Sequence, residues 1–159
     1  MILALQQPVA IDLRFIVVVL KVNNDLERIG DLAENLTARA VYLAEREPMP
    51  EPMAIINGMF VTIRSMLKDS LDSLVKLDVD LARKVIEQDD GVDQINRQMY
   101  DDFRQMMARD ASMIEQATSW LSCSRYLERI ADLATNISED VVFMVEGEVV
   151  RHQTQETSL

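Results

Sequence analysis

Apolar residues recur at intervals of three and four along almost the whole chain, which is the period of an amphipathic helix. The first such stretch includes Leu13, Ile16, Val17 and Leu20 and continues as far as Leu43. No segment combines the two-residue alternation of a strand with the turns of a hairpin. The pattern therefore predicts an all-α fold, an antiparallel helical bundle with long helices over about 9–46, 53–77, 80–109 and 113–146.

Prolines and short polar side chains indicate where these helices begin and end. The prolines in the segment Glu47-Pro-Met-Pro-Glu-Pro52 each remove a backbone donor, so they are expected to end the first helix and form a linker over 48–52. Asp78 or Asp80 can cap the third helix. Ser112 and Glu115 match a capping box for the fourth helix, in which each side chain accepts from a backbone N–H of the first turn.

The composition excludes several classes of function. The 159 residues include 27 acidic and 16 basic ones, and the net charge of -11 repels phosphate backbones, so nucleic acid is not an expected partner. One cysteine, Cys123, and one histidine, His152, are too few for a disulfide framework, a Cys-rich zinc site or the usual histidine-based catalytic sites. The longest apolar run, residues 15–20, is too short to span a membrane.

One segment occurs twice in the chain. Leu26-Glu-Arg-Ile-Gly-Asp-Leu-Ala-Glu-Asn-Leu36 returns 101 residues later as Leu127-Glu-Arg-Ile-Ala-Asp-Leu-Ala-Thr-Asn-Ile137, with eight of eleven positions identical. The first and last helices are therefore two copies of one element. Because two helices precede the second copy and none precedes the first, residues 1–47 are interpreted as the last helix of an incomplete repeat and residues 53–147 as a complete three-helix repeat.

This division has consequences for assembly and for the C-terminus. A long helix with a wide apolar face is not stable alone in water, so the first helix must pack on the three-helix unit or on another copy of the chain. The sequence therefore predicts a homo-oligomer or a helix-swapped dimer. The segment 148–159 is polar and is expected to be a frayed tail.

Each copy of the repeat carries a row of oxygen ligands at four-residue spacing, which places them on one side of a helix. The third helix has its own version of the row. The candidate metal ligands are Glu27, Asp31, Asp89, Asp93, Glu128 and Asp132, and the possible supporting residues are Asp90, Asn35 and Asn136.

Carboxylates gathered in this way must take up protons, pair with cations or bind a metal. Oxygen ligands suit Mg²⁺, Ca²⁺, Mn²⁺ or iron rather than a thiol-bound zinc. The alternative is a solvated acidic face neutralised by neighbouring arginines, but the recurrence of Glu-Arg-Ile-x-Asp favours ion binding. A ferritin-like di-iron site requires Glu-x-x-His motifs, which this chain lacks. No glycine-rich phosphate loop and no activated nucleophile is present, so the chain is not expected to be an enzyme.

These motifs resemble the phosphate-uptake regulator (PhoU) family. The resemblance is carried by Leu3-Ala-Leu-Gln-Gln-Pro-Val-Ala-Ile-Asp-Leu-Arg14, by the duplicated Glu-Arg-Ile-x-Asp motif and by Gly147-Glu-Val-Val-Arg-His152. It implies three-helix repeats that each hold a metal ion at Glu/Asp-x-x-x-Asp motifs, with iron, zinc, manganese or magnesium as the cofactor. Residue by residue, Glu128 and Asp132 match one motif and Asp89 and Asp93 match its partner.

The resemblance further implies a negative regulator of phosphate uptake and of the phosphate-starvation response. Its partners would be the ATPase subunit of a phosphate ABC transporter and a sensor histidine kinase, and its place the cytoplasmic, inner face of the membrane. Glu27 and Asp31 match the motif of the first repeat, but the helix that would supply their partners does not precede them here. The alternative function is a helical adaptor that binds no metal.

Overall fold

The computed structural model describes residues 10–147 and is almost entirely helical. It contains α2 (Ala10–Ala44), α3 (Pro50–Lys76), α4 (Val79–Arg109) and α5 (Ile114–Glu146), with the short 3₁₀ helix η1 (Ala111–Met113) before α5. No strand occurs in this part of the chain. The predicted all-α fold is confirmed, and the predicted tail 148–159 lies outside the described residues.

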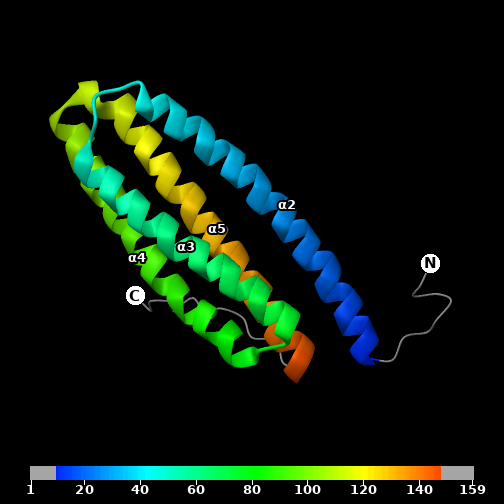
Figure 1. The fold of residues 1–159 in the computed structure, drawn as a ribbon. Coiled ribbons are helices and arrows are strands. Elements are labelled where there is room, and N and C mark those ends of the chain that lie inside the picture. The colour runs from blue at the N-terminus through cyan, green and yellow to red at the C-terminus, as the bar shows by residue number, and fades with distance from the viewer. Residues whose placement is uncertain (1–9, 148–159) are drawn as a thin grey trace.

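The four long helices run alternately up and down, and α5 occupies the centre of the bundle (Figure 1). It packs against α2 on one side and against α3 and α4 on the other, and α3 also packs against α4. Helix α2 packs mainly on α5. The two copies of the repeat therefore lie antiparallel in neighbouring helices, one on the outer helix and one on the central helix.

The helix ends follow the sequence signals at some points and depart from them at others. Asp78 caps α4 as expected, because its Oδ1 accepts a hydrogen bond from the backbone N–H of Leu81 at 3.0 Å. Helix α3 begins at Pro50, three residues before the expected start, since proline is tolerated in a first turn. The expected capping box is wrong. Asp110 instead accepts from the backbone N–H and the hydroxyl of Ser112, so the chain forms η1 before α5 begins.

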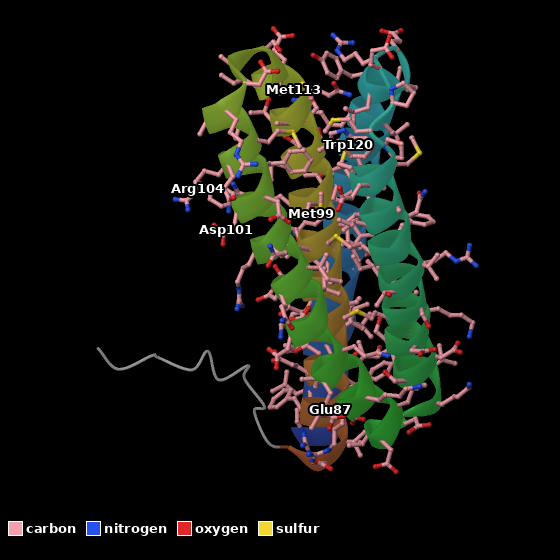
Figure 2. All side chains as sticks on the ribbon, turned by 90° about the vertical axis from the view of Figure 1, so that its left-hand side faces the viewer. Glu87, Met99, Asp101, Arg104, Met113 and Trp120 are labelled. Carbon is pink, nitrogen blue, oxygen red and sulfur yellow. The ribbon has the colours of Figure 1, made fainter. Side chains whose placement is uncertain are left out.

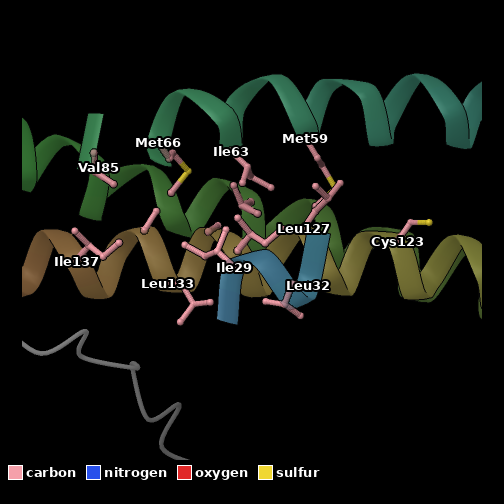
Figure 3. Packing of buried hydrophobic residues seen from close by; sticks show 14 of the residues in the cluster. Ile29, Leu32, Met59, Ile63, Met66, Val85, Cys123, Leu127, Leu133 and Ile137 are labelled. Carbon is pink, nitrogen blue, oxygen red and sulfur yellow. The ribbon is translucent and has the colours of Figure 1, made fainter. Parts of the chain in front are cut away.

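The core is aliphatic and rich in methionine. Met59, Ile63 and Met66 of α3 point toward α5, where Leu127 lies below Met59 and Ile63, and all four side chains are buried (Figure 3). The unbranched methionine side chains fill irregular space between the helices, which suits a chain with few aromatic residues. Figure 2 shows the α4 side of the bundle, where Met99 also lies inside the core.

The shared residues of the repeat hold the two copies together. Ile29 and Leu32 of α2 are buried, and so are their counterparts in α5, Ile130 and Leu133. Figure 3 shows Ile29 and Leu32 next to the central helix. The Ile-x-x-Leu face of the motif thus forms the contact between α2 and α5. The acidic face of each copy lies outside this contact.

None of the helices in residues 10–147 has an apolar stretch long enough to cross a bilayer.

Candidate metal centre

Two antiparallel helices bring the acidic motifs of α4 and α5 together. Asp93 lies one turn after Asp89 on α4, and Asp132 lies one turn after Glu128 on α5. Asp93, Glu128 and Asp132 each offer a carboxylate oxygen, and these atoms lie within 4.8 Å of one another. We call these three residues the carboxylate cluster. Within residues 10–147 it is the only place where three or more Asp, Glu, His or Cys side chains converge this closely.

Asp89 lies one turn before Asp93 on α4 and is not one of the three converging residues. It is 4% exposed and belongs to the apolar stripe of α4 that also includes Val85 and Val92. Its negative charge contributes to raising the pKa of Glu128, so the two carboxyl groups are electrostatically coupled. Of the four residues matched from the sequence, three therefore converge, and Asp89 is coupled to them only through its charge on Glu128.

The surroundings of Glu128 disfavour its charged form. Burial raises the pKa of Glu128 most, and the charges of Asp132 and Asp93 raise it further, to about 7. The positive charge of Arg125 opposes this effect. Near neutral pH the cluster must therefore hold a proton on Glu128 or gain a positive charge from elsewhere.

Part of that positive charge comes from arginine. Arg97 Nη2 donates a hydrogen bond to Asp93 Oδ2 at 2.8 Å, one turn along α4. The Arg97 side chain is 75% exposed, so this ion pair contributes little to stability. A cation that took the Asp93 oxygen would displace a weak partner.

The donor set fits a hard cation. The three side chains supply oxygen atoms only, at a separation that one ion can bridge, and this is the ligand type preferred by Mg²⁺, Mn²⁺ and Ca²⁺. A soft site is not available here, because Cys123 is buried in the core on another part of α5 and burial raises the pKa of its thiol to about 11. What the cluster can do chemically is to hold a cation and tie α4 to α5.

The first copy of the motif is arranged differently. Glu27 and Asp31 are exposed on α2, and Asn35 uses its amide to donate to the backbone carbonyl of Asp31 at 2.8 Å. Asp90 and Asn136, the remaining candidate supporting residues, are also exposed. In residues 10–147, no second acidic motif faces the first copy.

A second cluster of charged side chains, between α2 and α5, was not predicted from the sequence. Asp25 and Asp140 are 7% and 4% exposed, and Lys21 of α2 forms an ion pair with Asp140 of α5. Burial raises the pKa of Asp25, and the charge of Asp140 raises it further. A signal was present in the sequence, because Asp25 falls at helical spacing between Val22 and Ile29 on the buried stripe of α2.

Comparison with known proteins gives a consistent match. A family model described as the PhoU domain matches residues 1–40 and 56–141. A relative from Aquifex aeolicus, named phosphate-specific transport system accessory protein PhoU homolog, is 41% identical over 151 residues. The match covers 95% of this chain and 68% of that protein. The Escherichia coli protein named phosphate-specific transport system accessory protein PhoU is 33% identical, over 95% of this chain and 62% of its own length.

Solved structures agree with the sequence matches. The crystal structure of PhoU from Pseudomonas aeruginosa superposes with a TM-score of 0.87 and 35% identity, over 92% of this chain and 70% of that one. The phosphate transport system regulatory protein PhoU from Streptococcus pneumoniae gives a TM-score of 0.77 and 28% identity, over 92% and 69% of the two chains. The chain thus spans about two thirds of the length of these proteins.

Proposed function

The chain belongs to the PhoU family, and from this premise we propose that it is a metal-stabilised, non-enzymatic negative regulator of phosphate uptake and of the phosphate-starvation response. Relatives carry the name of accessory proteins of the phosphate-specific transport system, which supports a role beside a transporter rather than in catalysis. The observation that carries the metal part of the proposal is the convergence of Asp93, Glu128 and Asp132.

The cation acts as a link between helices. Asp93 belongs to α4, whereas Glu128 and Asp132 belong to α5, so an ion bound by all three holds the two helices in one register. It also neutralises charges that raise the free energy of the folded state when they stand alone. Iron, zinc, manganese or magnesium would supply this positive charge. The helical faces positioned in this way would then be recognised by a partner.

The proposed partners are the ATPase subunit of a phosphate ABC transporter and a sensor histidine kinase. Exposed apolar side chains on α2 support a protein interface, because Phe15 is 53% exposed, Leu20 65% and Val41 59%. A homo-oligomer or helix-swapped dimer could use the same face. The proposed location is the cytoplasm, at the inner face of the membrane where such a transporter lies.

The test compares the two copies of the motif. Metal analysis of the purified protein is combined with thermal melting, with and without a chelator, for the wild type and for a variant with alanine at Asp89, Asp93, Glu128 and Asp132. A variant with alanine at Glu27 and Asp31 is the matched control, since it removes the same motif from α2. We expect bound metal and chelator-sensitive melting in the wild type and in the control, and neither in the fourfold variant.

Two results would contradict the proposal. Equal metal content in the wild type and the fourfold variant would exclude the carboxylate cluster as the site. Absence of metal, with melting that no added divalent cation changes, would favour the helical adaptor that binds no metal. The regulatory role is tested separately in cells that lack the gene. In phosphate-rich medium their phosphate uptake should rise, and the wild-type gene should restore it.

A further inference from the structure

A pocket of about 630 Å³ lies between α4 and α5, directly beside the carboxylate cluster. It shares Glu128 with the cluster and is otherwise lined by different residues. The side chains that carry the following argument are Asn96, Arg97, Tyr100, Ser122 and Arg125. Most of these groups carry hydrogen-bond donors, and the pocket also has two carboxylates, those of Glu128 and Asp101.

The antiparallel course of the two helices explains why donors gather here. Arg97 follows Asp93 by one turn on α4, and Arg125 precedes Glu128 by about one turn on α5. Because α4 and α5 run in opposite directions, both steps lead toward the same end of the bundle. Two guanidinium groups therefore line one pocket next to three carboxylates. Arg125 forms no ion pair with any residue of the described part of the chain.

The neutral groups of the pocket, like its two arginines, favour an anionic ligand. The Oδ1 of Asn96 accepts a hydrogen bond from the hydroxyl of Ser124 at 2.7 Å, which leaves the N–H groups of Asn96 as donors. Tyr100 adds a hydroxyl group that can donate, whereas the hydroxyl of Ser122 donates to the backbone carbonyl of Thr118 at 2.7 Å and leaves only its oxygen at the pocket. A planar guanidinium group donates two parallel hydrogen bonds to a phosphate, so a pair of arginines with the amide of Asn96 and the hydroxyl of Tyr100 matches a tetrahedral oxyanion.

We propose that this pocket binds a phosphate group, as inorganic phosphate or as the phosphate of a small phosphomonoester, and that a cation in the carboxylate cluster promotes its binding. The proposal rests on the proposed function, because it requires the cation. Without the cation, Glu128 lines the pocket with an acidic group, and Asp93 engages Arg97. With the cation, the negative charge of the cluster is offset and Arg97 becomes available to the anion. Asp101 is the other carboxylate of the pocket, and its Oδ1 lies 3.7 Å from Arg104 Nη2, which offsets its charge.

This coupling is reciprocal by thermodynamic necessity. A cation that raises the affinity for phosphate by some factor has its own affinity raised by phosphate by the same factor, and such factors are typically about 5–150-fold. The regulator would then respond to lower concentrations of phosphate in its metal-loaded form than in its metal-free form. The same ligand would also tighten the contact between α4 and α5, because it is held from both helices.

The experiment is a calorimetric titration of the whole chain with inorganic phosphate, in the presence of Mg²⁺ or of a chelator. We expect phosphate to bind at least about fivefold more tightly with Mg²⁺. Arg97→Gln and Arg125→Gln should each weaken phosphate binding about tenfold while Mg²⁺ still raises the melting temperature. Arg64→Gln is the matched control, since Arg64 is an exposed arginine of α3 outside the pocket, and it should bind phosphate like the wild type.

The outcomes separate this proposal from the proposed function. Stabilisation by Mg²⁺ without any binding of phosphate would overturn the pocket and leave the metal centre intact. Equal heats with acetate, or an equal loss in Arg64→Gln, would also overturn it, because the binding would then be general screening of charge. A chain that Mg²⁺ does not stabilise would overturn both the metal centre and the coupling. Titration with glycerol 3-phosphate distinguishes the two sources: tighter binding than inorganic phosphate assigns the pocket to a phosphomonoester, and weaker binding assigns it to free phosphate.

Discussion

Glu128→Gln should make the metal-free protein more stable at alkaline pH and remove part of its pH dependence. The pKa of Glu128 is raised from its ordinary 4.5 to about 7, first by burial and then by Asp132 and Asp93. Between these two pH values the folded state holds a proton that the unfolded state has released. The contribution of Glu128 to the free energy of unfolding is therefore fully present below about pH 4.5 and is lost as the pH rises through about 7.

The size of the effect follows from the shift. One pKa unit corresponds to about 1.4 kcal/mol, and Glu128 is only partly buried, so solvent screening reduces the full value. We expect the wild type to lose about 1–3 kcal/mol of unfolding free energy on this account between pH 5 and pH 8. The amide of Glu128→Gln cannot ionise, so the variant should not show this loss.

The assay is urea denaturation at several pH values between 5 and 8, with chelator present throughout. Glu27→Gln is the control, because Glu27 occupies the same position of the motif on α2 but is exposed. Other groups, such as Asp25 with its raised pKa, contribute equally to all three proteins and cancel in the differences. If the stability of Glu128→Gln falls with pH in parallel with the wild type, the reasoning from the carboxylate cluster is wrong.

Three further predictions concern the packing of the bundle. Lys21→Ala removes the cation paired with buried Asp140 and should lower the unfolding free energy by about 1–3 kcal/mol in urea denaturation; a change below about 0.5 kcal/mol would contradict a structural ion pair. Leu127→Ala should cost about 2–5 kcal/mol because Leu127 is 1% exposed, whereas Leu26→Ala, its counterpart at 40% exposure, should cost less than about 1 kcal/mol. The Cys123 thiol, with its pKa raised to about 11 by burial, should react with a thiol reagent at pH 8 roughly a hundredfold more slowly in the folded protein than in urea, and equal rates would contradict its burial.

Helix type and approximate helix boundaries were predictable from local pattern. A period of three to four residues specifies a helix wherever it occurs, and Asp78 caps α4 because its side chain reaches an N–H only three residues away. The capping box expected at Ser112 was also predicted from neighbouring residues alone, and a residue two positions before Ser112 explains why it was wrong. Asp110 accepts from the Ser112 N–H that Glu115 was expected to bind, and the chain forms η1 instead of the expected capping box.

The sequence by itself determined that Glu128 and Asp132 share one side of a helix and that Glu27 and Asp31 do the same. Spacing alone could not decide which pair faces another acidic pair, because the two copies are locally almost identical, and it was the family resemblance that paired Glu128 and Asp132 with Asp89 and Asp93. The tertiary structure gives the physical reason, because it places α5 against α4 and leaves the acidic side of α2 exposed. The pairing of Lys21 with Asp140 has the same origin, since the two residues are 119 positions apart and become neighbours only when α2 packs on α5. Spacing along one helix is fixed by the backbone, whereas proximity between helices depends on which apolar faces are buried together.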